Sequence, residues 1–185
     1  IAADFLSQAE HGRDSQAIMV TADSSIVEQV INAIEKQLEV LPRKEITEQA
    51  LSHSRIIVLK DKQEIIDFTN LYAPEHLIIQ TADYAEIARE IRNAGSVFLG
   101  AYTPESAGDY ASGTNHTLPT NGYAHAYSGV NLDSFIKKMT FQEISADGIC
   151  HLGETICVMA ENERLEAHRN AVIVRLETLK QDETI

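Results

Sequence analysis

Near the start of the chain, a glutamine and a histidine three positions apart carry side chains that could bind a ligand or a metal. Gln8 and His11 stand near the end of a predicted amphipathic helix, with Gly12 as its expected C-cap. Residues three apart share a helix face, so the Gln8 amide oxygen and the His11 ring can converge on one point. Polar residues at the fraying end of a surface helix would give the same pattern, and that alternative stays open.

A second group, Glu75 and His76, stands where a predicted helix gives way to a strand that begins at His76. Reactive groups of α/β proteins gather at strand ends. A carboxylate and an imidazole, with ordinary pKa values of about 4.3 and 6.5, are suited to accept protons near neutral pH. An ordinary polar turn is the alternative interpretation.

The third group lies in a polar segment, residues 104–129, that lacks hydrophobic periodicity. Long loops of this kind are usually functional or disordered, and the tyrosines of this one argue against disorder. Glycine and serine let the backbone approach a ligand closely, and Asp109 and His116 offer oxygen and nitrogen donors that zinc accepts. A purely structural, turn-rich loop is the alternative.

The fourth group is Glu163 and His168, in a stretch (residues 160–179) that we predict to be helical. Five residues correspond to about 140° of rotation on an α-helix, so the two side chains would occupy different faces. A ligand against the side of the helix could touch both, although a solvated tail helix is the simpler interpretation. The remaining histidines, and Cys150 and Cys157, are expected to be ordinary surface or packing residues.

Strands that alternate with helices would position these groups. Short β-branched runs predict strands at residues 17–21, 55–59, 76–80 and 96–99. Apolar residues at three- and four-residue spacing predict helices at 26–38, capped by Ser24 or Ser25, at 65–71, and at 84–91, ending before Gly95. The fold class is therefore α/β, with an incomplete, nucleotide-fold-like parallel sheet flanked by helices.

Helical pattern returns at residues 135–144 and 160–179. We place a boundary near Asn131, which divides an α/β body (residues 1–130) from a helical C-terminal tail (residues 131–185). The sheet is small for its class and the sequence begins without methionine, so we expect the chain to be part of a longer protein.

Composition excludes several classes of partner. Lysine and arginine total 15 against 28 acidic residues, a net charge of −13, which repels nucleic-acid phosphates and anionic lipid. No apolar run approaches the roughly 20 residues that span a bilayer, and no secretion-signal pattern is present. Two cysteines are too few for a disulfide framework. We expect a cytoplasmic protein that binds neither nucleic acid nor membrane.

Three of these motifs together resemble the histidinol dehydrogenase family. They are Gln-Ala-Glu-His-Gly at residues 8–12, Ala-Pro-Glu-His-Leu at 73–77 and Pro-Glu-Ser-Ala-Gly-Asp-Tyr-Ala-Ser-Gly-Thr-Asn-His at 104–116. Their order and intervals fit the family, and so do the continuation at 117–123 and the tail Arg-Leu-Glu-Ala-His at 164–168. The resemblance implies an oxidoreductase of histidine biosynthesis that oxidises L-histidinol through L-histidinaldehyde to L-histidine, with NAD as oxidant.

The resemblance also implies a role for each residue. Zn²⁺ would be held by Gln8, His11, Asp109 and His168. His76 would accept the alcohol proton as hydride leaves for NAD, and Glu75 would activate the water that adds to the aldehyde. Contacts to substrate would come from Gln8, His11, Glu75, His76, Asp109, His116, Glu163 and His168. A donor set without thiolate leaves more positive charge on zinc, which would chiefly position the substrate.

A homodimer is a further implication of the resemblance. Glu163 and His168 would then complete the neighbouring chain's site, and residues 131–185 would form a dimerisation tail. Family members are more than twice this length, and the absent amino-terminal half would carry most of the NAD contacts; no GxGxxG motif occurs here. We expect the isolated chain to keep all or part of the zinc site but to show little NAD-dependent turnover.

Two other functions compete with this interpretation. The chain could be a non-catalytic module for metal binding or dimerisation. It could also be a zinc hydrolase with Glu75 as base on metal-bound water, although the sequence contains no HExxH motif.

Overall fold

The computed structural model describes residues 1–182. The chain forms two compact units, Ile1–Ile136 and Lys137–Ile185. The sequence placed a boundary near Asn131, whereas the structure divides the chain after Ile136.

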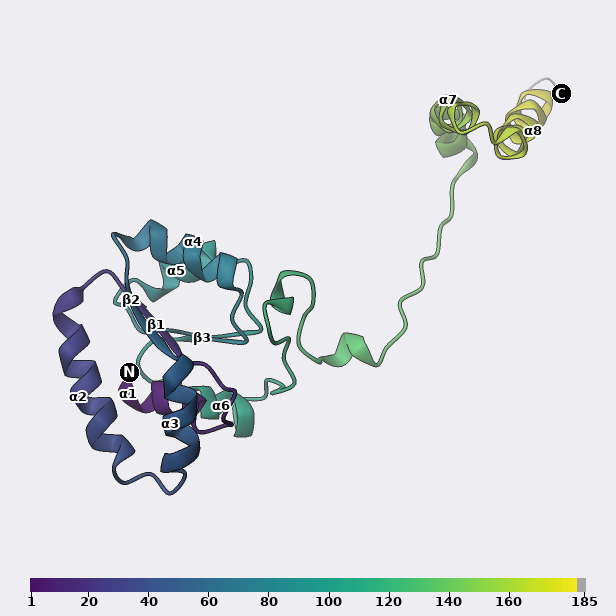
Figure 1. Ribbon diagram of the computed structural model, residues 1–185. Helices are drawn as coiled ribbons and strands as arrows, with labels where there is room; N and C mark the ends of the chain where they lie inside the picture. Colours follow the sequence, from purple (N-terminus) through teal and green to yellow (C-terminus); the bar gives the residue numbers. More distant parts are fainter. Residues whose placement is uncertain (183–185) are drawn as a thin grey trace. The chain divides into compact units, whose positions relative to one another are not determined.

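Two pairs of parallel strands form the centre of the first unit (Figure 1). β1 (Ile18–Thr21) pairs with β2 (Arg55–Val58), and β3 (His76–Ile79) pairs with β4 (Ser96–Leu99). The four predicted strands and their parallel direction are confirmed. The expectation of a single sheet is corrected, because β1 and β3 both line a cleft of about 1330 Å³ and no ladder joins the two pairs within the described residues.

Helices bury their apolar faces around these strands. α1 (Ala2–Ala9), η1 (Ser24–Ile26), α2 (Val27–Leu38) and α3 (Lys44–His53) belong to the part of the unit built on β1 and β2. One core cluster there includes Phe5, Leu6, Met19, Val30 and Ile34, and apolar residues recurring at helical spacing explain which face of α2 is buried.

A smaller cluster lies beside β3. α4 (Lys62–Tyr72) and α5 (Tyr84–Glu90) lie together on one side of the strands (Figure 1), and Ile66, Ile79 and Ile87 form their common core. The helices predicted at 65–71 and 84–91 are thus confirmed, with α5 ending just before the stretch that leads to Gly95.

Some local expectations were wrong. Neither Ser24 nor Ser25 caps α2; instead the Asp23 carboxylate accepts the Ser25 backbone N–H and caps η1, which leads into α2. α3 was missed. The polar segment 104–129 is not continuous loop, because it contains α6 (Glu105–Tyr110) and η2 (Tyr123–His125).

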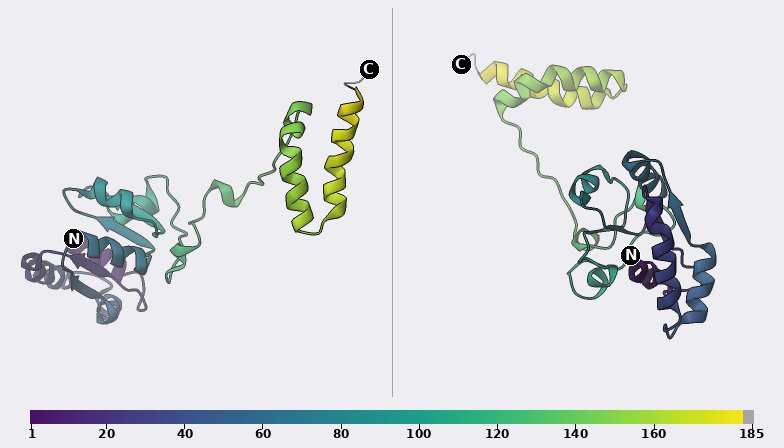
Figure 2. Two further views of the ribbon diagram at one scale, coloured as in Figure 1. Left: turned by 90° about the horizontal axis from the view of Figure 1, so that it is seen from above. Right: turned by 90° about the vertical axis from the view of Figure 1, so that its left-hand side faces the viewer.

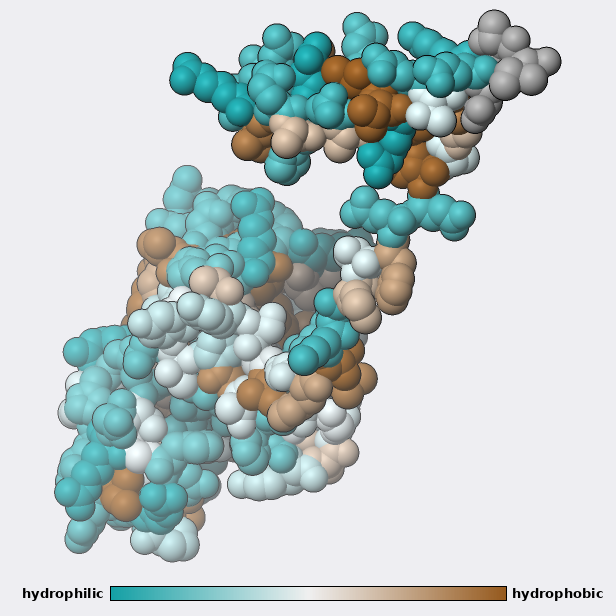
Figure 3. All heavy atoms as spheres, turned by 90° about the vertical axis from the view of Figure 1, so that its right-hand side faces the viewer, coloured by the Kyte–Doolittle hydropathy of each residue, from teal (hydrophilic) through white to brown (hydrophobic). Residues whose placement is uncertain are grey.

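The second unit is a hairpin of two helices, α7 (Ala146–Asn162) and α8 (Glu166–Asp182), seen side by side in Figure 2. Gly153 allows close packing between them, since a β-carbon there would lie 2.7 Å from a methyl group of Leu176. Apolar side chains also reach the surface of this unit (Figure 3), and Leu152, Val158 and Met159 are between 49 and 60% exposed.

The helical predictions for the tail need two corrections. Residues 135–144 are not helical; the short 3-10 helix η3 (Leu132–Ser134) ends immediately before them. Phe135 and Phe141 are 79 and 86% exposed, so these apolar side chains make no packing contacts that would stabilise a helix. The predicted helix 160–179 is interrupted, because α7 ends at Asn162 and Arg164 adopts a positive φ of 61°. Among residues 1–182, no helix has the length and apolar character needed to cross a bilayer.

Candidate metal and substrate site

His11 stands just beyond the end of α1. The helix ends at Ala9 and Glu10 is its C-cap, so the expected capping role of Gly12 was wrong. The His11 Nδ1 atom lies 2.9 Å from the Ser7 carbonyl oxygen, and because a carbonyl can only accept, Nδ1 carries the proton. In the neutral ring this leaves the Nε2 lone pair available, an arrangement typical of histidines that bind metals.

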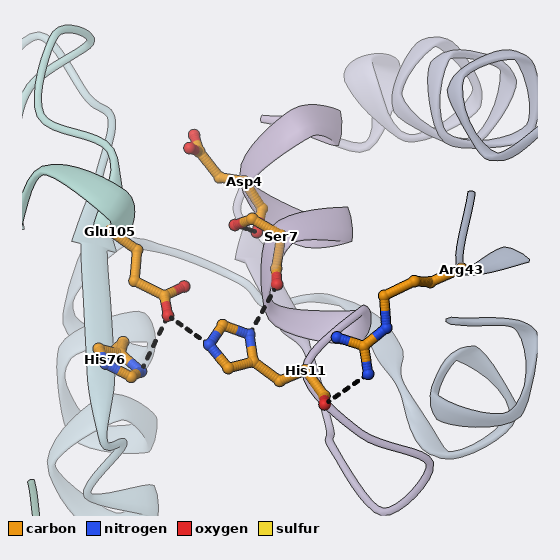
Figure 4. Close-up of polar contacts among 6 residues, drawn as sticks. All are labelled: Asp4, Ser7, His11, Arg43, His76 and Glu105. Atoms are coloured by element: carbon orange, nitrogen blue, oxygen red, sulfur yellow. Dashed lines mark hydrogen bonds and ion pairs between the residues drawn. The ribbon is translucent and has the colours of Figure 1, made fainter. Parts of the chain in front are cut away.

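Glu105 connects His11 with His76. It is the first residue of α6, and only 2% of it is exposed. Its Oε1 atom lies 3.8 Å from His11 Nε2 and 3.6 Å from His76 Nδ1. Figure 4 shows this carboxylate between the two rings. The His76 ring also lies against Phe98 of β4, with 6.1 Å between ring centroids.

α6 adds Asp109 to the same place. Glu105 and Asp109 are four residues apart, so they share a face of the helix. One ligand atom from each of His11, Glu105 and Asp109 can be chosen so that all three lie within 4.8 Å of one another. Gly108 lets α6 approach β4, because a β-carbon there would lie only 2.6 Å from the Phe98 ring.

Several buried polar atoms of this region lack hydrogen-bond partners. They are Gln8 Oε1, His76 Nδ1, His76 Nε2 and Glu105 Oε1. Folded proteins leave few such atoms unsatisfied, because each costs the desolvation free energy of the group. Gln8, Glu75, His76 and Glu105 also line the cleft between the two strand pairs. Unsatisfied donors and acceptors beside a cleft are expected where a ligand or ion binds.

Burial and neighbouring charges change the acidity of these groups. Burial raises the pKa of Glu105 to about 7; nearby His11 opposes the shift, and the negative charges of Asp109 and Glu75 add to it. Burial likewise raises the pKa of Glu75. Burial lowers the pKa of His76, against the influence of Asp109. His76 is therefore a neutral imidazole near pH 7, the form that can accept a proton.

The structure gathers most but not all of the residues singled out in the sequence. Gln8, His11, Glu75, His76 and Asp109 belong to the first unit and to this region. His116 is exposed on the segment after α6, and no hydrogen bond or ion pair described within residues 1–182 connects it to the cluster.

Glu163 and His168 belong to the second unit. Glu163 is the C-cap of α7, and His168 stands in the first turn of α8. The estimate of 140° between them assumed one continuous helix, and the turn at Arg164 invalidates it.

Glu105 is the functional candidate that the sequence did not reveal. Its burial depends on the packing of α6 against Phe98, which no local pattern encodes. The one available signal was Pro104 followed by an acidic residue, a combination typical of a helix start. Recognising that start would have placed Glu105 and Asp109 one turn apart on the same face.

Comparisons with known proteins identify the family of this chain. The family model for histidinol dehydrogenase matches residues 1–176. The histidinol dehydrogenase of Bacteroides fragilis is 61% identical over 181 residues, which cover 98% of this chain and 42% of that protein. The Campylobacter jejuni enzyme is 51% identical over 180 residues, with coverages of 97% and 42%.

A solved structure gives the same result in three dimensions. The crystal structure of histidinol dehydrogenase from Elizabethkingia anophelis matches with a TM-score of 0.89 and 58% identity, over 97% of this chain and 41% of that one. The chain thus spans less than half the length of these relatives. Agreement of sequence and fold over nearly all its residues shows that this chain belongs to the histidinol dehydrogenase family.

Proposed function

We propose that this chain is the metal- and substrate-binding part of an NAD-dependent enzyme that oxidises L-histidinol through L-histidinaldehyde to L-histidine. The observation that carries the proposal is the partly buried cluster in which Gln8, His11 and Asp109 lie near the proton acceptors Glu75 and His76, with His11 at its exposed edge. These residues come from three distant segments of a chain that belongs to the histidinol dehydrogenase family.

The residues present fit a zinc ion. Gln8 Oε1 is buried without a partner, His11 Nε2 is left unprotonated by the bond from Nδ1 to Ser7, and Asp109 supplies a carboxylate. His168 of a second chain would complete this set of nitrogen and oxygen donors, which zinc accepts. Bound zinc would supply positive charge that holds the imidazole and amino nitrogens of histidinol.

The proton transfers belong to the pair at the start of β3. His76, kept neutral by burial, would accept the proton of the substrate alcohol as that alcohol is oxidised. Glu75, half-buried and one residue away, is the base for the water that adds to the aldehyde. Bound NAD would supply the oxidant, as hydride acceptor, for both the alcohol and the hydrated aldehyde. His116 and Glu163 would add substrate contacts.

The remaining parts of the enzyme would come from outside this chain. Most NAD contacts would lie in the segment that the relatives have and this chain lacks, since the chain covers about 42% of their length. Glu163 and His168 would act in the site of a second copy, in a cytoplasmic homodimer that binds neither nucleic acid nor membrane. Residues 131–185 would then be the dimerisation tail.

Two measurements on two proteins test the proposal. One protein is the chain as given, and the other is the chain joined to the upstream part of its Bacteroides fragilis relative. We expect both to bind zinc, measured by metal analysis after dialysis, and only the joined protein to form NADH when histidinol is added.

A folded, zinc-loaded joined protein that forms no NADH would refute the enzymatic proposal. It would leave a non-catalytic module for metal binding or dimerisation, the alternative consistent with the partial length of the chain. Loss of zinc from both proteins on dialysis would contradict the metal site itself.

A further inference from the structure

The carboxylate of Glu105 is the buried acidic group that the proposed mechanism does not use. Its side chain is only 3% exposed, yet no hydrogen bond satisfies Oε1. It faces His76 and His11 at 3.6 and 3.8 Å. A buried carboxylate without a partner is costly, so its retention at this point requires an explanation.

His76 also lacks the hydrogen bonds that a buried polar side chain normally makes. Both of its ring nitrogens are buried and lack a hydrogen-bond partner, and Nδ1 is the one that faces Glu105. The 3.6 Å between Nδ1 and Oε1 is slightly longer than a hydrogen bond. Hydrogen bonds among catalytic groups are often long before substrate binds and shorten in the complex. A small rotation of either side chain would therefore satisfy both atoms.

We propose that Glu105 is a positioning residue, whose carboxylate accepts a hydrogen bond from the His76 Nδ1–H and thereby keeps Nε2 of that ring as the proton acceptor. The inference rests on the proposed function for the role of His76. When Glu105 is ionised its carboxylate can only accept, and the contact then fixes which nitrogen of His76 carries the hydrogen. The Phe98 ring borders His76 on the side of β4, with 6.1 Å between the ring centroids.

Direct ligation of the metal is the competing role for Glu105. Its distance to His11 Nε2 is compatible with two ligands of one ion. Glu105 also belongs, with His11 and Asp109, to the three residues whose ligand atoms lie within 4.8 Å of one another. The positioning role is favoured because Nδ1 of His76 faces Glu105 and is buried without a hydrogen-bond partner among residues 1–182. The two roles differ in one measurable respect, because loss of a ligand lowers zinc affinity and loss of a positioning contact to His76 does not.

The first experiment uses the chain as given and needs no turnover. Nitrogen-15 NMR of the imidazole ring reports whether His76 carries its hydrogen on Nδ1, and competition with a chromophoric chelator reports zinc affinity. We expect the Nδ1–H form in the unmodified chain and its loss in Glu105→Leu, with zinc affinity changed by less than about tenfold, the lower limit of outer-shell effects. Glu90→Gln, at an exposed glutamate of α5, is the matched control and should change neither.

A folding defect in the variants can be distinguished from a change in the His76 tautomer. Leucine fits a buried site, so Glu105→Leu should fold, and Glu105→Gln keeps the shape of the side chain if it does not. Retention of the Nδ1–H form in folded Glu105→Leu would refute the proposal. A loss of zinc affinity well beyond tenfold would also refute it and assign Glu105 to the metal.

The second experiment uses the joined protein described above. Glu105→Leu should lower kcat by about 10- to 100-fold with little change in KM for histidinol. In a His76→Ala background the same substitution should have no further effect on kcat, because the two residues act as a unit. An additive effect would contradict positioning. An inactive unmodified joined protein would refute the proposed function, while the tautomer measurement would still decide the role of Glu105.

Discussion

Glu105 places a carboxylic acid where its charged form is poorly solvated, and stability should depend on pH for that reason. Its pKa is about 7 in the folded chain and 4.5 ordinarily, so the folded state holds this proton more tightly than the unfolded state. The contribution to stability is full below about pH 4.5 and is lost as the pH rises through 7. The loss amounts to at most about 3 kcal/mol.

Glu105→Gln should remove this dependence. Without metal, the variant should gain stability relative to the unmodified chain between pH 5 and pH 8, measured by urea unfolding followed by circular dichroism. The lowered pKa of His76 acts in the opposite direction in both proteins, so the difference between them isolates Glu105. Parallel stability curves across this range would show that the carboxylate is not buried as described.

Zinc affinity should depend on His11 and on pH. A histidine binds a metal only when its ligating nitrogen is unprotonated, so affinity should fall as the solution becomes acidic. His11→Ala should weaken binding by more than tenfold at pH 7.5, as expected for loss of a direct ligand. His151→Ala, an exposed histidine of α7, is the control and should leave affinity unchanged. Full zinc occupancy with every histidine protonated would contradict the assignment.

At the residue level, the sequence indicated which side chains could react or bind a metal, but not which of them would be buried. Gln8, His11, Glu75, His76 and Asp109 could be singled out because their types and spacing form motifs. Glu105 could not, since an acidic residue after proline is ordinarily solvated. What distinguishes it is the contact of α6 with β4, a property of tertiary packing.

At the level of elements, α6 is held by a close approach that tolerates no side chain. A β-carbon at Gly108 would overlap the Phe98 ring at 2.6 Å, so Gly108→Ala should displace the helix and move Asp109 with it. We expect weaker zinc binding and a loss of roughly 1–3 kcal/mol in stability, typical of overpacking. Ser106→Ala, at an exposed position of the same helix, is the control. Unchanged zinc affinity in Gly108→Ala would mean that Asp109 is not placed by this contact.

Helices and strands were predicted correctly where their apolar residues pack into a core. The four strands and helices α2, α4 and α5 were recognisable because their apolar residues meet a core. Residues 135–144 carry a similar apolar pattern but are exposed, and a helix of that length is not stable in water without tertiary contacts. The arrangement of strands into two pairs depends on long-range geometry that the periodicity of one segment does not contain.

For the whole molecule, the proposed sharing of sites predicts complementation between chains. In the joined protein, mixing a His168→Ala chain with a His11→Ala chain should restore about one intact site per heterodimer, because each defective residue would lie in a different site. Recovery of NADH formation after the two are unfolded and refolded together is the measurement. Each variant refolded alone is the control, and absence of rescue in confirmed heterodimers would refute sharing.

The left-handed turn at Arg164 limits where the chain can tolerate an insertion or a deletion. Glu163 and His168 stand on opposite sides of that turn, one closing α7 and the other in the first turn of α8. One residue inserted after Glu166 would lengthen the connection between Glu163 and His168 and rotate His168 by about 100° around the axis of α8 relative to Glu166. Such an insertion should abolish function, whereas one between residues 137 and 144, where the chain forms neither helix nor strand, should be tolerated. Natural variation in length should therefore accumulate before α7 and avoid the tip of the hairpin.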